Sequence, residues 1–178
     1  TWNAKDGQDG GNDYWRGTCT YSTTFAAPAF DAASQEVWLQ FEGVNSSAKV
    51  LLNGRNICTH DGGYSTFRVH VSDLLAKDNQ LTVEVDNSIN DRVYPQKADF
   101  TFYGGIYREA ELILTERTAI SPLYLGSDGV LVHPQTVGPE KVEGEIEVHI
   151  TSKGDNSCTL NVDITSPRGE RVFSKRQK

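Results

Sequence analysis

Apolar and polar residues alternate along most of this chain, with a repeat of two. In the run 37–42, Val37, Leu39 and Phe41 fall on one face of an extended strand, and Gln40 and Glu42 face the other way. Each run has the length of an ordinary strand. The pattern therefore predicts half-buried strands, separated by turn residues, at 37–42, 49–52, 67–71, 81–86 and 110–114.

Turn signals punctuate these runs. Asn53-Gly54 follows one of them and predicts a tight hairpin, because both residues of such a turn take a positive φ. Only 72–77 could form a helical turn, with Ser72 or Asp73 as its N-cap. Many short strands without alternating helices predict an all-β fold, a sandwich or jelly roll rather than a parallel sheet.

The pattern breaks near 117–122 and then restarts, which predicts two domains, 1–117 and 118–178. The second has strand-like runs at 130–133, 144–150, 159–164 and 171–173. Two apolar faces, one of Ile146, Val148 and Ile150 and the other of Leu160, Val162 and Ile164, predict an immunoglobulin-like β-sandwich. About 60 residues is short for that fold, so we expect it to be incomplete, with an open sheet edge that favours association.

Composition narrows the classes of function. A net charge of −7 argues against binding nucleic acid, which needs clustered Lys and Arg. No apolar run approaches the roughly 20 residues that cross a bilayer, and no segment resembles a signal peptide. We expect a soluble protein, with the cytoplasm and the periplasm or exterior of a bacterium both open as compartments. The chain has no Met, so we expect it to start inside a longer reading frame.

Residue types that carry catalysis or bind metals are scattered. The three cysteines, at wide and irregular spacing, predict neither a disulfide framework nor a zinc site, and we read them as small, half-buried apolar residues. The four histidines lie on different segments without metal-ligand spacing, so no metal site is predicted. No phosphate-binding or dinucleotide-binding motif occurs. Most acidic residues fall on the solvent-facing side of strands, as Glu84 and Glu147 do.

The stretch 86–108 differs from the rest. It leaves a strand into a long loop, 91–103, in which Tyr94, Phe100, Phe102 and Tyr103 surround Asp99. Long loops inside compact domains are usually functional. Aromatic faces with a carboxylate suit sugars, whose C–H faces pack on rings while their hydroxyls seek acceptors. The alternative is a folded loop whose aromatic side chains fill the end of its own sandwich.

Six motifs, in a fixed order over nearly all of 1–117, carry a family resemblance. They are YWRG at 14–17, WLQFEGV at 38–44, AKVLLNGR at 48–55, GGYSTF at 62–67, NQLTVEVDN at 79–87 and YGGIYR at 103–108. This series resembles the N-terminal sugar-binding domain of glycoside hydrolase family 2, which includes β-galactosidases, β-glucuronidases and β-mannosidases. Residues 118–178 are similar, more weakly, to the start of the family's immunoglobulin-like domain.

The resemblance implies a retaining glycosidase whose two catalytic glutamates lie in a (β/α)₈ barrel. The family's acid/base Glu follows an Asn, and this chain has no Asn-Glu dipeptide. We therefore expect no catalytic residue here, and no activity from this segment alone, because hydrolysis with retention needs two paired carboxyl groups. The resemblance also implies three partners for this segment: the catalytic barrel, a carbohydrate substrate and further copies of the enzyme in a homo-oligomer.

The resemblance also assigns roles in the 91–108 region. Asp99 lies nine residues before Arg108 and matches a family Asp that contacts the sugar, with Phe100 supporting the pocket wall. Arg108 and Tyr103 are expected to structure the loop, since the guanidinium of an arginine suits carboxylates and carbonyls. No cofactor or metal is expected in this segment. In the complete enzyme the family binds Na⁺ or Mg²⁺, and Asp99 would be a sodium ligand.

The sequence indicates the sugar less specifically than it indicates the family. Glucuronidases usually have Asn where this chain has Phe102, which favours a β-galactosidase-like enzyme over a β-glucuronidase or β-mannosidase. Two other classes of protein stay open. One is a free-standing carbohydrate-binding module that uses the 91–103 loop, and the other is a structural interaction domain.

Overall fold

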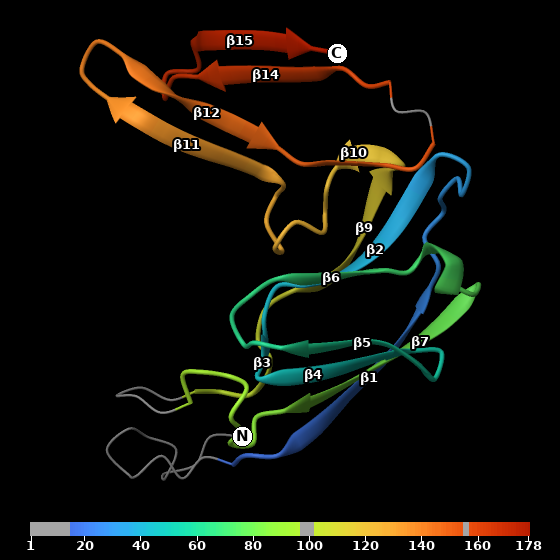
Figure 1. The fold of residues 1–178 in the computed structure, drawn as a ribbon. Helices are drawn as coiled ribbons and strands as arrows, with labels where there is room; N and C mark the ends of the chain where they lie inside the picture. The colour runs from blue at the N-terminus through green and yellow to red at the C-terminus, as the bar shows by residue number, and fades with distance from the viewer. Residues whose placement is uncertain (1–14, 97–101, 155–156) are drawn as a thin grey trace.

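The computed structural model describes residues 15–96, 102–154 and 157–178 of the chain. Within them the chain is all-β, as predicted, with one short 3₁₀ turn between strands β6 and β7. Figure 1 shows two units, a sandwich that carries β1 to β9 and a smaller group of strands, β10 to β15, beyond one end of it. No helix in the described parts of the chain is long and apolar enough to cross a membrane.

Two antiparallel sheets build the first unit. One has the order β1 (Thr18–Ala26), β7 (Asp78–Asp86), β4 (Ser47–Leu52), β5 (Arg55–Asp61). The other has the order β6 (Phe67–His70), β2 (Gln35–Phe41), β9 (Ala110–Glu116). A short pair, β3 (Val44–Asn45) with β8 (Gly105–Ile106), lies at the end from which the 87–104 loop emerges.

The core lies between these two sheets. From β2 come Val37 and Phe41, both 0% exposed, and from β4 and β7 come alternate residues such as Val50 and Val83. Phe41 also stacks on Phe67, with ring centroids 4.9 Å apart. Period-2 alternation thus predicted the inward faces, because successive side chains of a strand point to opposite sides.

The predicted hairpin is confirmed. Asn53 has φ 52° and Gly54 has φ 78°, so both adopt the left-handed conformation that a tight two-residue turn between β4 and β5 requires. The helical turn predicted at 72–77 is present only as a shorter 3₁₀ turn, η1 (Ser72–Leu74). Its N-cap position is Val71 and no side chain caps it, because the hydroxyl of Ser72 bonds the backbone N of Val37 and the carboxylate of Glu36 instead.

The outer face of β2 departs from the prediction. Gln40 faces away from the core, as alternation requires, yet Glu36, Trp38 and Gln40 are only 5%, 5% and 6% exposed. Gln40 lies between its register partners in the flanking strands and bonds both of their side chains, donating to Glu111 over 2.6 Å and accepting from Arg68. A central strand is thus covered by polar neighbours, which the period of the pattern does not reveal.

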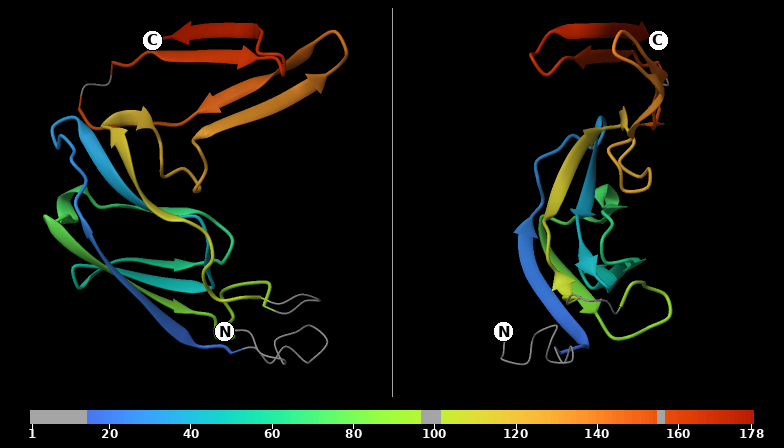
Figure 2. Two further views of the ribbon diagram at one scale, coloured as in Figure 1. Left: turned by 180° about the vertical axis from the view of Figure 1, so that it is seen from behind. Right: turned by 90° about the vertical axis from the view of Figure 1, so that its left-hand side faces the viewer.

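The second unit consists of strand pairs. β10 (Thr118–Ile120) pairs with β13 (Ile150–Ser152), β11 (Val130–Val137) with β12 (Val142–Val148), and β14 (Leu160–Thr165) with β15 (Arg171–Gln177). The predicted apolar face of Ile146, Val148 and Ile150 is divided, because the strand is interrupted at His149 and Ile150 pairs with β10. Residues of these strands are at most half-buried. Figure 2 shows the same pairs from two further sides.

All three cysteines are free, but the expectation of half-buried side chains holds only for Cys58. Cys19 and Cys158 are exposed. Cys19 lies in β1, which pairs along its whole length with β7 and was not predicted as a strand. Its sequence is rich in Thr and Ser and it is mostly exposed, so it lacks the buried alternation by which the other strands were recognised.

Candidate functional site

The loop between β7 and β8 emerges at one end of the sandwich, and its two described parts are 87–96 and 102–104. Asp99 and Phe100, the predicted sugar-contacting residues, lie outside the described residues. What the structure shows is how the chain on either side of them is held.

Arg16 holds the first part of this loop. Its Nη1 donates to the carbonyl of Asn87 and its Nη2 to the carbonyl of Gln96, both over 3.0 Å. The side chain of Asn87 in turn accepts a 2.8 Å bond from the backbone N of Gly17. A guanidinium has several donors in a rigid fork, so one side chain can tie the beginning of this part of the loop to its last described residue, Gln96.

Side-chain amides order the same part internally. The backbone N of Asn90 donates to Oε1 of Gln96 over 3.0 Å, and Nε2 of Gln96 donates back to the carbonyls of Asn90 and Val93. Oδ1 of Asn90 accepts from the backbone N of Arg92 and Val93, an Asx turn. Val93, 5% exposed, packs inward. This stretch is thus ordered by its own polar side chains and by one buried apolar contact.

A third contact joins the loop to the first sheet. Nε of Arg92 lies 2.9 Å from Oδ2 of Asp61 at the end of β5, and Ser47 donates to the other oxygen of Asp61 over 2.5 Å. The hydrogen bonds from Ser47 and Arg92 lower the pKa of Asp61. Asp61 is therefore an ionised acceptor that serves structure.

Asn45 holds the other end of the loop. Its Nδ2 donates to the carbonyl of Tyr103 over 2.6 Å, and Phe102 is 4% exposed. Two glycines follow because the chain passes close to other groups. A Cβ on Gly104 would lie 2.6 Å from Nδ2 of Asn87, and one on Gly105, at φ +102°, would collide with the hydroxyl of Tyr21. The Gly-Gly of the family motif is therefore required by close packing.

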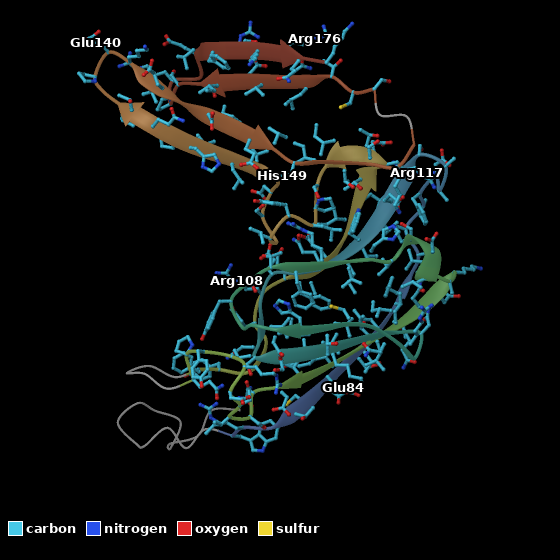
Figure 3. The ribbon with its side chains drawn as sticks, in the orientation of Figure 1. Glu84, Arg108, Arg117, Glu140, His149 and Arg176 are labelled. Carbon is cyan, nitrogen blue, oxygen red and sulfur yellow. The ribbon has the colours of Figure 1, made fainter. Side chains whose placement is uncertain are left out.

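The two predicted loop-structuring residues take different places. Tyr103 contributes its carbonyl to the bond with Asn45, and its ring is 46% exposed. Arg108 follows β8, is exposed and makes no hydrogen bond or ion pair with another described residue. Figure 3 shows it on the side of the sandwich from which the loop emerges. The loop-structuring roles predicted for Arg108 and Tyr103 stay predictions.

Exposed tyrosines surround this end of the sandwich. Besides Tyr103, they are Tyr64 at 55%, Tyr94 at 73% and Tyr107 at 44% exposed. Tyr107 donates from its hydroxyl to the carbonyl of Gly63 over 2.5 Å, and its ring meets that of Tyr64 edge-on at 6.4 Å. The sequence-based prediction did not include Tyr64 and Tyr107 in the site. Their places in two of the six motifs, GGYSTF and YGGIYR, were the signal that could have found them.

Two clefts open on the described surface. One, of about 110 Å³, is lined by Trp15, Tyr21 and Asn87, and the other, of about 280 Å³, by residues that include His60, Phe67 and Leu125. Sites that enclose a small molecule usually have about 300 to 1,000 Å³. Neither cleft is large enough to surround a saccharide by itself.

Hydrogen bonds hold several of the described carboxyl groups in the ionised form. Wherever a shift is resolved among them, the pKa is lowered, and the groups concerned are Asp31, Glu36, Asp61 and Asp86. At Asp86, bonds from Ser88 and Thr18 are the cause. The acid of a glycosidase needs a raised pKa instead. These groups act as hydrogen-bond acceptors.

The described residues thus form a two-sheet sandwich whose β7–β8 loop is held at one end by side chains of the sandwich. A sequence profile described as "Glycosyl hydrolase 2 galactose-binding domain-like" matches residues 9–114. The chain belongs to glycoside hydrolase family 2, as the resemblance predicted, and corresponds to the N-terminal part of these glycosidases.

Individual relatives agree. The chain is 34% identical to a beta-glucuronidase of Bacteroides fragilis, over 100% of its own length and 26% of that protein. It is 29% identical to a beta-galactosidase of Thermoanaerobacterium thermosulfurigenes, over 78% of its length and 19% of that protein.

Solved structures show the same relationship. An FMN-binding beta-glucuronidase from Facaelibacterium prausnitzii L2-6 superposes with a TM-score of 0.87 at 38% identity, covering 99% of this chain and 28% of that one. A putative beta-galactosidase from Bacteroides fragilis superposes with a TM-score of 0.83 at 31% identity, covering 92% of this chain and 25% of that one. The chain thus spans about a quarter of the length of these relatives.

Proposed function

We propose that this chain is the non-catalytic N-terminal segment of a retaining glycoside hydrolase that cleaves O-glycosyl bonds in carbohydrate metabolism. Asp99 contributes a hydrogen bond to a sugar hydroxyl, with Phe100 beside it. The catalytic glutamates lie in a (β/α)₈ barrel in another part of the polypeptide. By itself the segment is inactive.

The observation that carries this proposal is the clamping of the loop on both sides of Asp99. Arg16 bonds the carbonyl of Gln96 and Asn45 bonds that of Tyr103, at the end of the sandwich where exposed tyrosines gather. The segment before β1 and the strand β3 hold these two positions, which is the support that a substrate-contacting residue needs. Clefts too small to surround a sugar suit a site that a second part of the enzyme completes.

Two sugars are candidates. A β-galactoside is the first, because the chain has Phe102 where glucuronidases usually have Asn. Phe102 is buried, however, so its identity reflects packing at the base of the loop more than contact with a sugar. A β-glucuronide is the second candidate, favoured by relatives named beta-glucuronidase at 34% and 38% identity. Hydrolysis of p-nitrophenyl β-galactoside and p-nitrophenyl β-glucuronide by the complete enzyme would decide between them.

We propose no cofactor in the described part of this segment. Na⁺ or Mg²⁺ would bind in the complete enzyme, where a carboxylate such as Asp99 would supply one oxygen ligand to Na⁺. Association into a homo-oligomer also belongs to the complete enzyme.

Isothermal titration of the 178-residue chain with galactose, lactose and glucuronate tests the proposal. One carboxylate and an aromatic wall do not offset the cost of association, so we expect no measurable binding. Binding in the low micromolar range would instead support a free-standing carbohydrate-binding module. The same chain should release no p-nitrophenol from either substrate, and turnover by it would refute the assignment of the catalytic residues to another part of the polypeptide.

A further inference from the structure

Glu36 is a buried carboxylate that the proposed site does not use. It lies on β2, on the strand's outer face, and its side chain is only 6% exposed. A carboxylate removed from water is costly unless charged or hydrogen-bonding partners surround it. The partners of this carboxylate therefore indicate its structural role.

The two carboxylate oxygens have partners from different parts of the chain. Oε2 contacts Nε2 of His70 on β6 and accepts a 3.0 Å bond from the hydroxyl of Ser72, both within the first unit. Oε1 lies 3.1 Å from Nζ of Lys153, directly after β13 of the second unit, and 3.7 Å from Nε of Arg117. One carboxylate thus bridges the two units.

The bridging residues are also linked through their backbones. The backbone N of Lys153 donates to the carbonyl of Arg117 over 3.2 Å, and the backbone N of Arg117 donates to the carbonyl of Ser34 over 2.8 Å. Arg117 separates β9 from β10, at the point where the two units meet (Figure 3). Its Nη2 reaches back to the carbonyl of Ala32 over 2.8 Å.

Arg68 makes a second connection between the units. Its Nη1 donates to the carbonyls of Pro122 and Ser127, both over 2.8 Å, in the turn that follows β10. Gly126 of that turn approaches the carbonyl of Thr66 so closely that a Cβ would not fit. Together with the chain itself at Arg117, the Glu36 and Arg68 contacts join the units at three places.

The chemistry of Glu36 fits permanent ionisation. Burial by itself raises the pKa of this carboxyl, but hydrogen bonds from His70, Lys153 and Ser72 outweigh burial and lower the pKa from 4.5 to about 2. At neutral pH the carboxylate that faces Lys153 is therefore ionised.

We propose that Glu36 is an ionic anchor that fixes the orientation of the second unit on the first, so that the junction at Arg117 is rigid rather than a hinge. Units within a chain are expected to move relative to each other unless a large apolar interface joins them. The strands of the second unit are at most half-buried, so a polar anchor takes the place of that interface. This inference does not depend on the proposed function.

Pulsed electron spin resonance on the 178-residue chain tests it. One spin label occupies Cys19 on β1 and the other a cysteine from Glu145→Cys on β12, both exposed, with Cys58→Ser and Cys158→Ser removing the other thiols. We expect a single narrow distance distribution. Lys153→Met should broaden it about twofold, as expected for units free to move, and Lys153→Arg, which keeps the charge, should restore the narrow distribution.

Lys49→Met is the matched control, because Lys49 pairs with Glu84 at 3.0 Å entirely within the first unit. It should leave the distribution unchanged. Equal widths for Lys153→Met and Lys49→Met would overturn the proposal. If Lys153→Met does not fold, Glu36→Gln takes its place, since an amide keeps the acceptor for Ser72 while it removes the charge, and an unbroadened distribution in that variant would overturn the proposal equally.

Discussion

Arg16 donates a hydrogen bond from Nη2 to the backbone carbonyl of Gln96, 80 positions further along the chain and 3.0 Å away. The same guanidinium holds the carbonyl of Asn87. One side chain just before β1 therefore ties down both ends of the first part of the loop.

Replacement of Arg16 by Gln should loosen that part of the loop. Two bonds from a charged donor are lost, each contributing about 1 to 2 kcal/mol. We expect faster hydrogen exchange at 87–96, a modest fall in the unfolding free energy and, in the complete enzyme, a lower kcat/KM. Arg171→Gln is the control, because Arg171 forms only an exposed pair with Asp163 in the second unit. Unchanged exchange at 87–96 would contradict the role of Arg16.

Asn45→Ala should release the other end of the loop. Asn45 is 6% exposed, and without its Nδ2 the carbonyl of Tyr103 loses a 2.6 Å bond. A hydrogen bond of this kind contributes about 0.5 to 1.5 kcal/mol to stability. Chemical denaturation should show a loss of that size, whereas Asn56→Ala, at an exposed position of β5, should show almost none. Similar losses in the two variants would argue against the clamp.

Gly105→Ala tests the close packing at β8. The residue has φ +102°, and its Cβ would collide with the hydroxyl of Tyr21. Backbone strain and the clash together should cost about 3 kcal/mol or more. Gly154→Ala, at φ +121° with open space around it, isolates the strain. Tyr21→Phe in the Gly105→Ala background should restore part of the stability, and no recovery would mean that the hydroxyl is not the obstacle.

Glu36 should make the stability fall in acid. Its pKa in the folded chain, about 2, lies below the ordinary 4.5, so its contribution is complete above pH 4.5 and is lost as the pH falls toward 2. The groups that face it are His70, Ser72, Arg117 and Lys153.

Denaturation of the wild-type chain and of Glu36→Gln between pH 7 and pH 2 measures this contribution. Asp31, Asp61 and Asp86 also have lowered pKa values, so they too make the stability of the chain fall in acid. Both proteins contain these three residues, so their effect is the same in the two curves. The difference between the two curves therefore belongs to Glu36 and should shrink below pH 4.5. A constant difference would show that Glu36 is not held ionised by its partners.

Asp99→Asn should lower kcat/KM of the complete enzyme roughly 10- to 100-fold while the fold stays intact, because a charged hydrogen bond contributes about 1.5 to 3 kcal/mol. Asp91→Asn is the matched control, another carboxylate in the same loop. Unchanged kinetics for Asp99→Asn would remove Asp99 from the site.

The local sequence determined much of the first unit. Alternation in β2, β4, β7 and β9 predicted the strands and their inward faces, and Asn53-Gly54 predicted the turn, because both signals arise between residues a few positions apart. The order of six motifs led to the family, which the profile match at 9–114 confirms.

Only the tertiary structure decided which polar residues are structural. Gln40 was expected to face away from the core and Glu36 was not singled out, yet both are buried by partners from other strands, and Ser72 bonds Glu36 where a helix cap was expected. Arg16 was noted only as part of the YWRG motif and Asn45 was not noted at all, although they clamp the loop. The physical reason is distance along the chain. Periodicity reports on neighbours in one strand, while these contacts join residues 28 to 80 positions apart that meet only once the sheets have formed.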